Sequence, residues 1–345
     1  MAYTTINKPS EYFNTKLYTG NNTSTSITGV GFQPDLTWFK RRDSSAQHSL
    51  FDSVRGVTKR LASNLTNAEN TITDALTSFD SDGFTLGVDS SNYINFNTAT
   101  YASWNWKANG AGVSNTDGSI ASTVSANDTA GFSIVKYTGT GSAGNVGHGL
   151  STAPKVLINK SISGANDWFV GHSSIGFTKF LKLNTTDYES TNSGIWNDTA
   201  PTSSFFTINS ANGNTNSTGV EYITYCFSEV KGFSKFGLYE GNGSADGTFV
   251  YTGFKPAFIL IKGKGTVSDW QLIDTKRSTF NVCNLRLQPN LSDAEAGSDT
   301  IDICSNGFKQ RNTFGNFNTS GQGYIYMAFA EEPLVGTNGV PATAR

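Results

Sequence analysis

One pattern occurs three times in this chain of 345 residues and limits its fold more than any other feature. Each copy has a Tyr-x-Gly, a polar glycine-rich loop, a proline, an apolar run and a lysine six residues after the proline. The copies are Tyr18–Lys40, Tyr137–Lys160 and Tyr239–Lys262. A pattern of this length, kept in phase, predicts repeated structural units rather than one irregular core.

The spacing of the copies sets the expected domain boundaries. Copies 2 and 3 lie 102 residues apart when measured at Pro154 and Pro256, and again at Tyr222 and Tyr324. Copies 1 and 2 lie about 18 residues further apart, and a stretch poor in large apolar residues accounts for the surplus. We therefore expect an arm (1–12), repeat 1 (13–108), a semi-extended linker (109–131), repeat 2 (132–231), repeat 3 (232–332) and a tail (333–345).

Four strand signals recur inside each repeat. An opening strand ends in Tyr-x-Gly, and a second strand follows the proline, which has no N–H to give to a ladder. Fourteen residues after the proline, His48, Trp168 or Trp270 marks a third strand that should form a hairpin with the second. A closing strand begins at a tyrosine, and its residues at +1, +3 and +5 are mostly large and apolar. This pattern predicts an all-β protein of three tandem homologous antiparallel β-sandwich domains of about 100 residues each.

The lysine that ends each copy is expected to lie at solvent, where the strand stops. The predicted structural anchors of the repeats are Tyr18, Pro34, Lys40, Tyr101, Tyr137, Pro154, Lys160, Tyr222, Tyr239, Pro256, Lys262 and Tyr324.

Composition excludes several classes of protein. The net charge is −2 and only 15% of residues are charged, which argues against a nucleic-acid binder. Three cysteines do not form a disulfide framework, and Cys226 lies in an apolar run typical of a buried thiol. The N-terminus has no apolar signal region, and no run approaches the ~20 residues of a membrane helix. We expect no signal peptide and no membrane insertion.

Ionisable residues give no catalytic pattern. The three histidines are not at metal-ligand spacing, so no metal or other cofactor is expected. Asp52 and Asp274 hold equivalent positions, but repeat 2 has His172 there, which argues against a shared acid or base. The sequence DSDG at 80–83 resembles part of a calcium loop, but the bidentate glutamate is missing and a plain turn is favoured.

Aromatic residues suggest a binding site more than a catalytic one. Trp38, Trp104 and Trp106 lie in expected strands, and Trp168 and Trp270 are equivalent, so all five are expected in cores. Trp196 is unpaired among the repeats and is expected to be an exposed loop contact. His148 and Asn242, in the glycine-rich loops, are the other candidate binding residues.

Several stretches together resemble a family of repeat-bearing proteins encoded by marine tailed bacteriophages. They are GFQPDLTWFKRR, FDSVRG, SFDSDGFTLG, SWNWK, VSNTDGSIASTVSANDTAGFSIVKYTG, WNDTAPTSS, EYITYCF and YIYMAFAEEP with the ending GVPATAR. The resemblance covers essentially the whole chain. It implies a virion location and β-sandwich domains of jelly-roll or lectin-like type, and it supplies no catalytic residues.

The leading hypothesis is a non-enzymatic virion structural protein, a tail fibre or other host-contacting adhesin. Two alternatives stay open: a capsid-bound decoration or head-fibre protein that stabilises the shell, and a depolymerase acting on host surface polysaccharide. The expected partners are other virion proteins of the tail or capsid, a host surface glycan, and further copies of the chain, with a trimer as one form. Synthesis is expected in the cytoplasm of the bacterial host.

Overall fold

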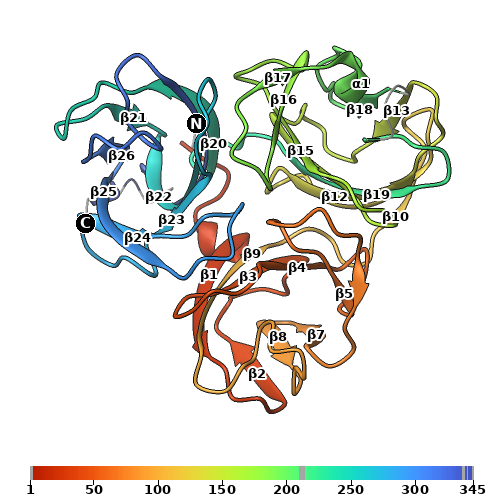
Figure 1. Ribbon diagram of the computed structural model, residues 1–345, viewed down its shortest axis with the longest axis horizontal. Coiled ribbons are helices and arrows are strands. Elements are labelled where there is room, and N and C mark those ends of the chain that lie inside the picture. The colour runs from red at the N-terminus through yellow and green to blue at the C-terminus, as the bar shows by residue number, and fades with distance from the viewer. Residues whose placement is uncertain (1–2, 210–213, 336–338, 340, 344–345) are drawn as a thin grey trace.

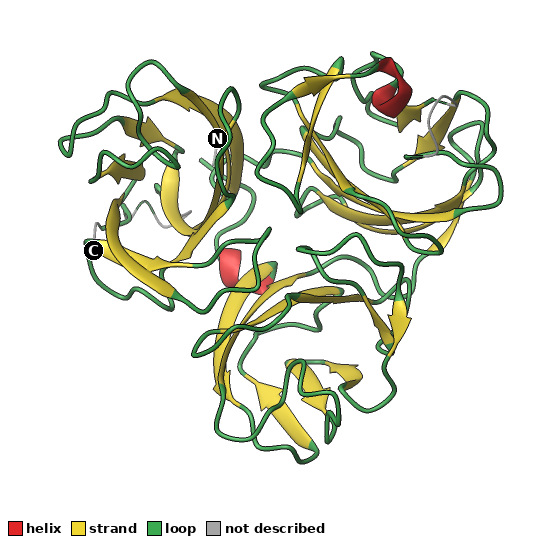
Figure 2. Cartoon of the chain, viewed as in Figure 1, coloured by secondary structure: helices red, strands yellow, loops and turns green. Residues whose placement is uncertain are grey.

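The computed structural model describes residues 3–209, 214–335, 339 and 341–343. In Figure 1 the strands form three lobes around a common centre. Within the described residues the only helices are a 3-10 turn, η1 (Pro9–Glu11), and a single short α-helix, α1 (Ser193–Trp196) (Figure 2). The predicted all-β class is confirmed. Residues 1–2 of the expected arm, and 336–338, 340 and 344–345 of the expected tail, lie outside the described residues.

The first sheet of every lobe has the same strand order: opening, closing, post-proline and third strand. In lobe 1 these are β1 (Phe13–Thr19), β9 (Thr100–Trp106), β3 (Leu36–Arg41) and β4 (Ser49–Asp52). In lobe 2 they are β12 (Phe132–Thr138), β19 (Glu221–Phe227), β14 (Val156–Ser161) and β15 (Trp168–His172). In lobe 3 they are β20 (Ser234–Glu240), β27 (Gly323–Pro333), β22 (Phe254–Gly263) and β23 (Gln271–Asp274).

The hairpins predicted between the post-proline and third strands are present in all three lobes. The tyrosine of the opening strand also faces the tyrosine of the closing strand in identical register, as in Tyr137 opposite Tyr222. The two rings of each pair are stacked, with centroids 5.1 to 5.2 Å apart. Such a pair fixes the register of the two strands, because a slip of one residue would separate the rings.

A second set of strands lies across each lobe from the first sheet. Lobe 1 has β2 (Thr25–Thr28), β8 (Gly83–Leu86) and β7 (Leu76–Asp80), with a small pair β5 (Lys59–Arg60) and β6 (Asn70–Thr71). Lobe 2 has β13 (Gly144–Gly147) and β18 (Phe205–Ile208). Lobe 3 has β21 (Phe249–Tyr251), β26 (Gly307–Gln310), β25 (Ala296–Cys304) and β24 (Cys283–Arg286).

The segment at 80–83 is the tight turn between β7 and β8, as predicted, since Asp80 pairs with Gly83. Each lobe has its own apolar cluster between its two sets of strands. Cys226 is a buried free thiol within the cluster of lobe 2, which confirms the prediction.

The other face of each first sheet packs against the other two lobes. The +1, +3 and +5 residues of the closing strands belong to one shared cluster at the centre of the molecule. Here Trp106 lies 6.3 Å from Phe227 of lobe 2 and 5.7 Å from Phe258 of lobe 3, measured between ring centroids. The cluster surrounds an apolar cavity of about 20 Å³ lined by all three lobes. The first sheets are therefore buried on both faces, and the lobes close into a ring (Figure 1).

The expected linker is part of lobe 2. It forms β10 (Val113–Asn115) and β11 (Ser122–Asn127), and β11 pairs along the whole of β12. At the far edge of this sheet β16 (Lys179–Lys182) and β17 (Ser190–Thr191) follow β15, which makes eight strands. The expected semi-extended spacer is thus a pair of strands, because Ile120 and Val124 contribute to the core of lobe 2.

Candidate functional site at the lobe junctions

Buried ionisable residues gather where one lobe meets the next. In lobe 1, Asp52 is the last residue of β4, and its carboxylate forms an ion pair with Nε of Arg55 at 2.6 Å. The hydroxyl of Tyr225, in lobe 2, donates to the same carboxylate at 2.8 Å. Glu69 binds the other side of the Arg55 guanidinium at 3.1 Å. The side chains of Asp52 and Arg55 are almost completely buried. The arginine holds the two carboxylates of lobe 1 together, and Tyr225 joins this network to lobe 2.

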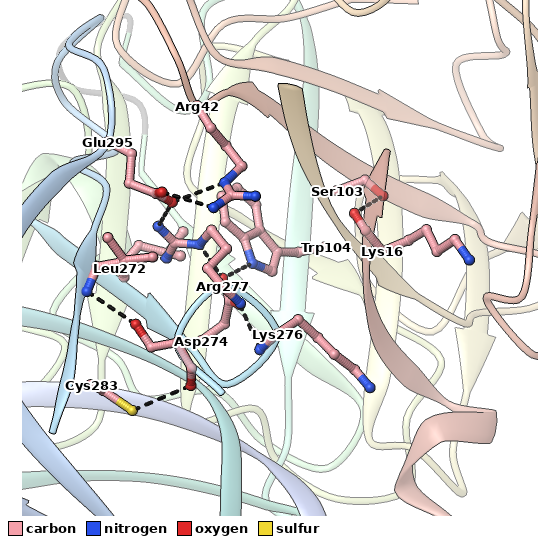
Figure 3. A network of polar contacts seen from close by, with 12 residues as sticks. Lys16, Arg42, Ser103, Trp104, Leu272, Asp274, Lys276, Arg277, Cys283 and Glu295 are labelled. Carbon is pink, nitrogen blue, oxygen red and sulfur yellow. Dashed lines mark hydrogen bonds and ion pairs between the residues drawn. The ribbon is translucent and has the colours of Figure 1, made fainter. Parts of the chain in front are cut away.

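The same arrangement recurs where lobe 3 meets lobe 1 (Figure 3). Arg277 lies between Asp274, at 2.5 Å, and Glu295, at 2.9 Å. The indole of Trp104, in lobe 1, donates to Asp274 at 3.0 Å, and Arg42 of lobe 1 pairs with Glu295 at 2.9 Å. This network therefore fastens lobe 3 to lobe 1 at two points.

Burial and charge act in opposite directions on these arginines. Burial alone would lower the pKa of Arg55 and of Arg277, but the nearby carboxylates outweigh it and raise both values. Both guanidinium groups stay charged, and each carboxylate is held by a donor of fixed geometry. Such a network positions lobes, since its carboxylates are bound to arginine rather than turned toward a substrate.

Lobe 2 makes the third junction with His172 in place of an aspartate. Its Nδ1 accepts from the backbone N–H of Ser174 at 3.1 Å, so its Nε2 carries the proton and donates to the carbonyl of Tyr326 in lobe 3 at 3.2 Å. Burial lowers the pKa of His172 to about 4. The position occupied by Asp52, His172 or Asp274 thus bonds to the closing strand of the next lobe in all three cases, although the residue type differs.

A second set of contacts runs around the ring in the opposite direction. Trp168 donates its indole N–H to the carbonyl of Ala62 in lobe 1, and Trp270 donates to that of Lys182 in lobe 2, both at 2.9 Å. His48 takes the place of these tryptophans in lobe 1. Its Nδ1 accepts from Trp38, and its Nε2 lies 3.1 Å from the carbonyl of Gln288 in lobe 3. The predicted structural role of the two tryptophans is confirmed, and both are buried.

The expectation that the three lysines lie at solvent is wrong. Lys40, Lys160 and Lys262 are at most 1% exposed. Lys160 donates to the carbonyl of Thr66 in lobe 1 at 3.0 Å, and Lys262 donates to that of Thr186 in lobe 2 at 2.9 Å. Burial lowers the pKa of all three from 10.5 to about 8. Lys160 and Lys262 thus bind a neighbouring lobe near the end of their strands, and Lys40 donates to the carbonyl of Arg41 in its own lobe. The sequence of one repeat does not reveal these partners.

The candidate binding residues do not come together. Trp196 is 1% exposed and lies in α1, inside the core of lobe 2, so the expected exposed loop contact is wrong. His148 is also buried, and it accepts from Leu150 N and bonds to Thr202 O. Asn242 is exposed, but its side chain closes its own turn through Ser244 and Asp246. Trp38, Trp104 and Trp106 are buried, as predicted.

Sequence reasoning missed the glutamates of the junctions. Glu69, Glu189 and Glu295 each donate a backbone N–H to a carbonyl of the neighbouring lobe, at 2.8 to 2.9 Å. Glu69 and Glu189 are 120 residues apart, as are Pro34 and Pro154, so their equivalence could have been found. Glu295 is displaced by four residues from the 102-residue spacing, which hides it.

The described residues contain neither a candidate metal site nor a candidate membrane-spanning helix. No group of three or more His, Cys, Asp or Glu residues in this part of the chain could hold a metal ion. No helix there is long and apolar enough to cross a membrane.

The fold and its junctions define a class: an all-β protein whose three lobes are joined into a ring by buried polar networks. The chain belongs to a family known as a domain of unknown function, DUF7483, whose model matches residues 8–333. The match spans all three lobes as a single unit. No curated protein and no solved structure matches the chain.

Proposed function

We propose that this protein is a non-enzymatic structural part of a phage virion, a tail fibre or another host-contacting adhesin built of three homologous β-sandwich repeats. The observation that carries the proposal is the use of the buried ionisable groups. Asp52, Asp274, His172, Lys160 and Lys262 each make a hydrogen bond across a lobe junction. These groups hold the ring closed, as suits a rigid exposed part of a particle.

Homology of the repeats is part of the proposal. It is supported by the common order of the four strands, by the stacked tyrosine pair in each lobe and by junction contacts at matching positions. Three unrelated units would have no reason to share all of these. In this proposal the rigid ring carries variable loops, and the loops make contact with the host surface.

The pseudo-threefold shape favours the second candidate, a capsid-bound decoration or head-fibre protein. A single chain with three similar lobes can sit on a threefold position of a shell and present a similar surface to each neighbour. The depolymerase hypothesis has no such support, because the two carboxylate pairs at the junctions each enclose a buried arginine.

Mass spectrometry and a reconstruction of the virion that carries the chain test the proposal. We expect the protein in purified particles, as three-lobed density on the tail. Density on the head, in multiples set by capsid symmetry, would instead identify the decoration protein. Absence of the chain from purified virions would refute both. Release of sugars from host envelope by the purified protein would show an enzyme.

A further inference from the structure

Lobe 2 has one side that its own two sets of strands do not close. This side lies between the edge of β12 and the edge of β13, and we call the matching region of every lobe its open side. Residues 113–127, the cover segment, fill it in lobe 2. β11 pairs with all of β12, and Ile120 bridges Val146 of β13 in parallel, with its N–H bonded to Asn145 O at 2.9 Å. The cover segment completes both the sheet and the core of this lobe.

Lobe 3 has the same two edges without a cover segment. In the part of the chain that the structure describes, β20 pairs with β27 alone and β21 pairs with β26 alone. Three large apolar side chains flank these edges: Leu238 on β20 is 45% exposed, and Phe249 and Tyr251 on β21 are 45% and 53% exposed. Leu238 lies on the same face of its sheet as Phe236, and the two rings lie on the face of β21 opposite to Val250 of the lobe 3 core. An uncovered edge flanked by apolar side chains is a site where another strand can add.

These apolar residues are not needed by the fold. From the strand registers, Leu238 corresponds to Lys136 in lobe 2. Phe249 and Tyr251 correspond to Asn145 and Gly147 in lobe 2, and to Ser26 and Thr28 in lobe 1. Small or polar residues therefore support β2 and β13, and a lysine supports β12, whereas lobe 1 has Leu17 at the position of Leu238. Lobe 3 alone combines an uncovered edge with two exposed aromatic rings.

The N-terminal residues already occupy one end of this open side. Tyr3 donates its hydroxyl to Gly253 O at 2.6 Å, and Thr4 donates to Lys231 O at 2.7 Å. Gly253 corresponds to Gly149, which in lobe 2 lies against Val124 and Ala126 of the cover segment. Tyr3 thus takes the place of the last residues of that segment, and a new strand would continue an interface that exists.

The middle of this edge is available for a strand, up to the carbonyl of Glu240, which accepts from the hydroxyl of Thr248 at 2.7 Å. Glu229 caps the N–H of Phe236 at 2.8 Å, so the available stretch begins at Gly237. A groove of about 370 Å³ adjoins this stretch, and it is lined by Leu238 and Glu240 of β20, by Lys264 after β22 and by Gly321–Gly323 at the start of β27. By the two-residue period of a strand, the N–H and C=O of Leu238 point away from β27, as the N–H of Phe236 does.

We propose that lobe 3 binds an extended segment of a partner protein, which adds as an antiparallel strand to the edge of β20 and crosses Phe249 and Tyr251. The segment has the chemistry of the cover segment, with small polar residues alternating with β-branched or other small apolar ones. Backbone hydrogen bonds to Leu238 supply affinity, and the exposed apolar side chains select residues that can pack on them. This inference goes beyond the proposed virion role and does not depend on it.

The test uses the whole protein and a synthetic peptide of residues 118–127 as probe. The probe omits Asn115 and Asp117, which in lobe 2 lie where a side chain at Gly147 would be, because lobe 3 has Tyr251 at that position. Binding is measured by fluorescence anisotropy and located by amide hydrogen exchange. We expect saturable binding with slowed exchange at Leu238 and Glu240, and no binding of a peptide with the same composition in scrambled order. Failure to bind at millimolar peptide, or protection confined to β12, would overturn the proposal.

Two variants supply the control. Leu238→Pro removes a backbone N–H that points away from β27, so the edge strand should tolerate it, and we expect binding at least tenfold weaker because the incoming strand loses that donor. Phe280→Lys removes a more exposed apolar side chain, 79% exposed, elsewhere on lobe 3, and should bind within twofold of the wild type. Equal losses in both variants would contradict a site on β20. Self-association of the chain abolished by Leu238→Pro, without peptide binding, would identify a second copy as the occupant and refute the extended segment.

Discussion

The indole N–H of Trp270 in lobe 3 donates to the backbone carbonyl of Lys182 in lobe 2. Matching contacts join lobe 2 to lobe 1 through Trp168 and lobe 1 to lobe 3 through His48. Because every lobe supplies one ring donor and one carbonyl acceptor, the contacts form a closed cycle. Loss of one junction leaves polar groups of two lobes without partners, so the ring should unfold as one unit.

Removal of a junction carboxylate should destabilise the whole ring. In Asp274→Ala, the buried Arg277 loses its nearest partner and the indole of Trp104 loses its acceptor. We expect a loss of about 3–5 kcal/mol in the free energy of unfolding, measured by urea denaturation. Asp52→Ala is the matched variant and should behave alike, since Arg55 and Tyr225 lose the same carboxylate. A loss below about 1 kcal/mol in either variant would show that its network is not needed.

The stacked tyrosines should contribute equally in the three lobes. Tyr101, Tyr222 and Tyr324 are fully buried, and each hydroxyl accepts a backbone N–H within its own lobe. Substitution of each by alanine leaves a cavity and an unpaired N–H, and should cost about 3–5 kcal/mol. Urea denaturation of the three variants measures the cost. If one variant were near zero, the lobes would not share one core design.

Acid should weaken the junction at His172. Its pKa is about 4 in the folded chain, against about 6.5 in an unfolded one, so the unfolded state binds more protons between these values. The contribution is fully present above pH 6.5 and is lost as the pH falls toward 4, by about 3 kcal/mol. The difference in unfolding free energy between wild type and His172→Gln isolates it, since other acidic groups cancel. A difference that stays constant from pH 7 to 4.5 would contradict the neutral, buried histidine.

Mild alkali should strengthen the junction at Lys160. Its pKa is lowered to about 8 by burial, so above that pH the folded chain releases a proton that the unfolded chain keeps until about 10.5. Stability from this residue therefore rises between these two values. We expect the wild type to gain about 2 kcal/mol relative to Lys160→Met between pH 7 and 9.5, by urea denaturation at each pH. If the wild type gained no stability relative to Lys160→Met over this pH range, the amine of Lys160 would be hydrated rather than buried.

The succession of four strands along each lobe, and the hairpin between the second and third, could be predicted because their signals are local. The prolines, the tyrosines and the alternation of the closing strand lie within a few residues of what they determine. The alternating face was also predicted to be buried, and it is, but against the other lobes rather than inside its own. Periodicity shows that a face is covered and does not show what covers it.

The junctions could not be predicted for the same reason. Lys262 follows an apolar strand and resembles a residue at a solvent-exposed strand end, yet its partner Thr186 lies 76 residues earlier, in another lobe. Trp196 stands in a polar stretch, and only the helix that turns it inward buries it. Both predictions failed where burial depends on contacts distant in sequence.

Joining the three lobes in one chain permits differences that identical subunits could not have. A homotrimer must repeat every surface three times, whereas here lobe 2 alone has the cover segment and lobe 3 alone has exposed aromatic residues beside an uncovered edge. A nearly symmetric ring can thus have a single attachment point. If strand addition is confined to lobe 3, as proposed above, each ring would engage one partner chain in one orientation.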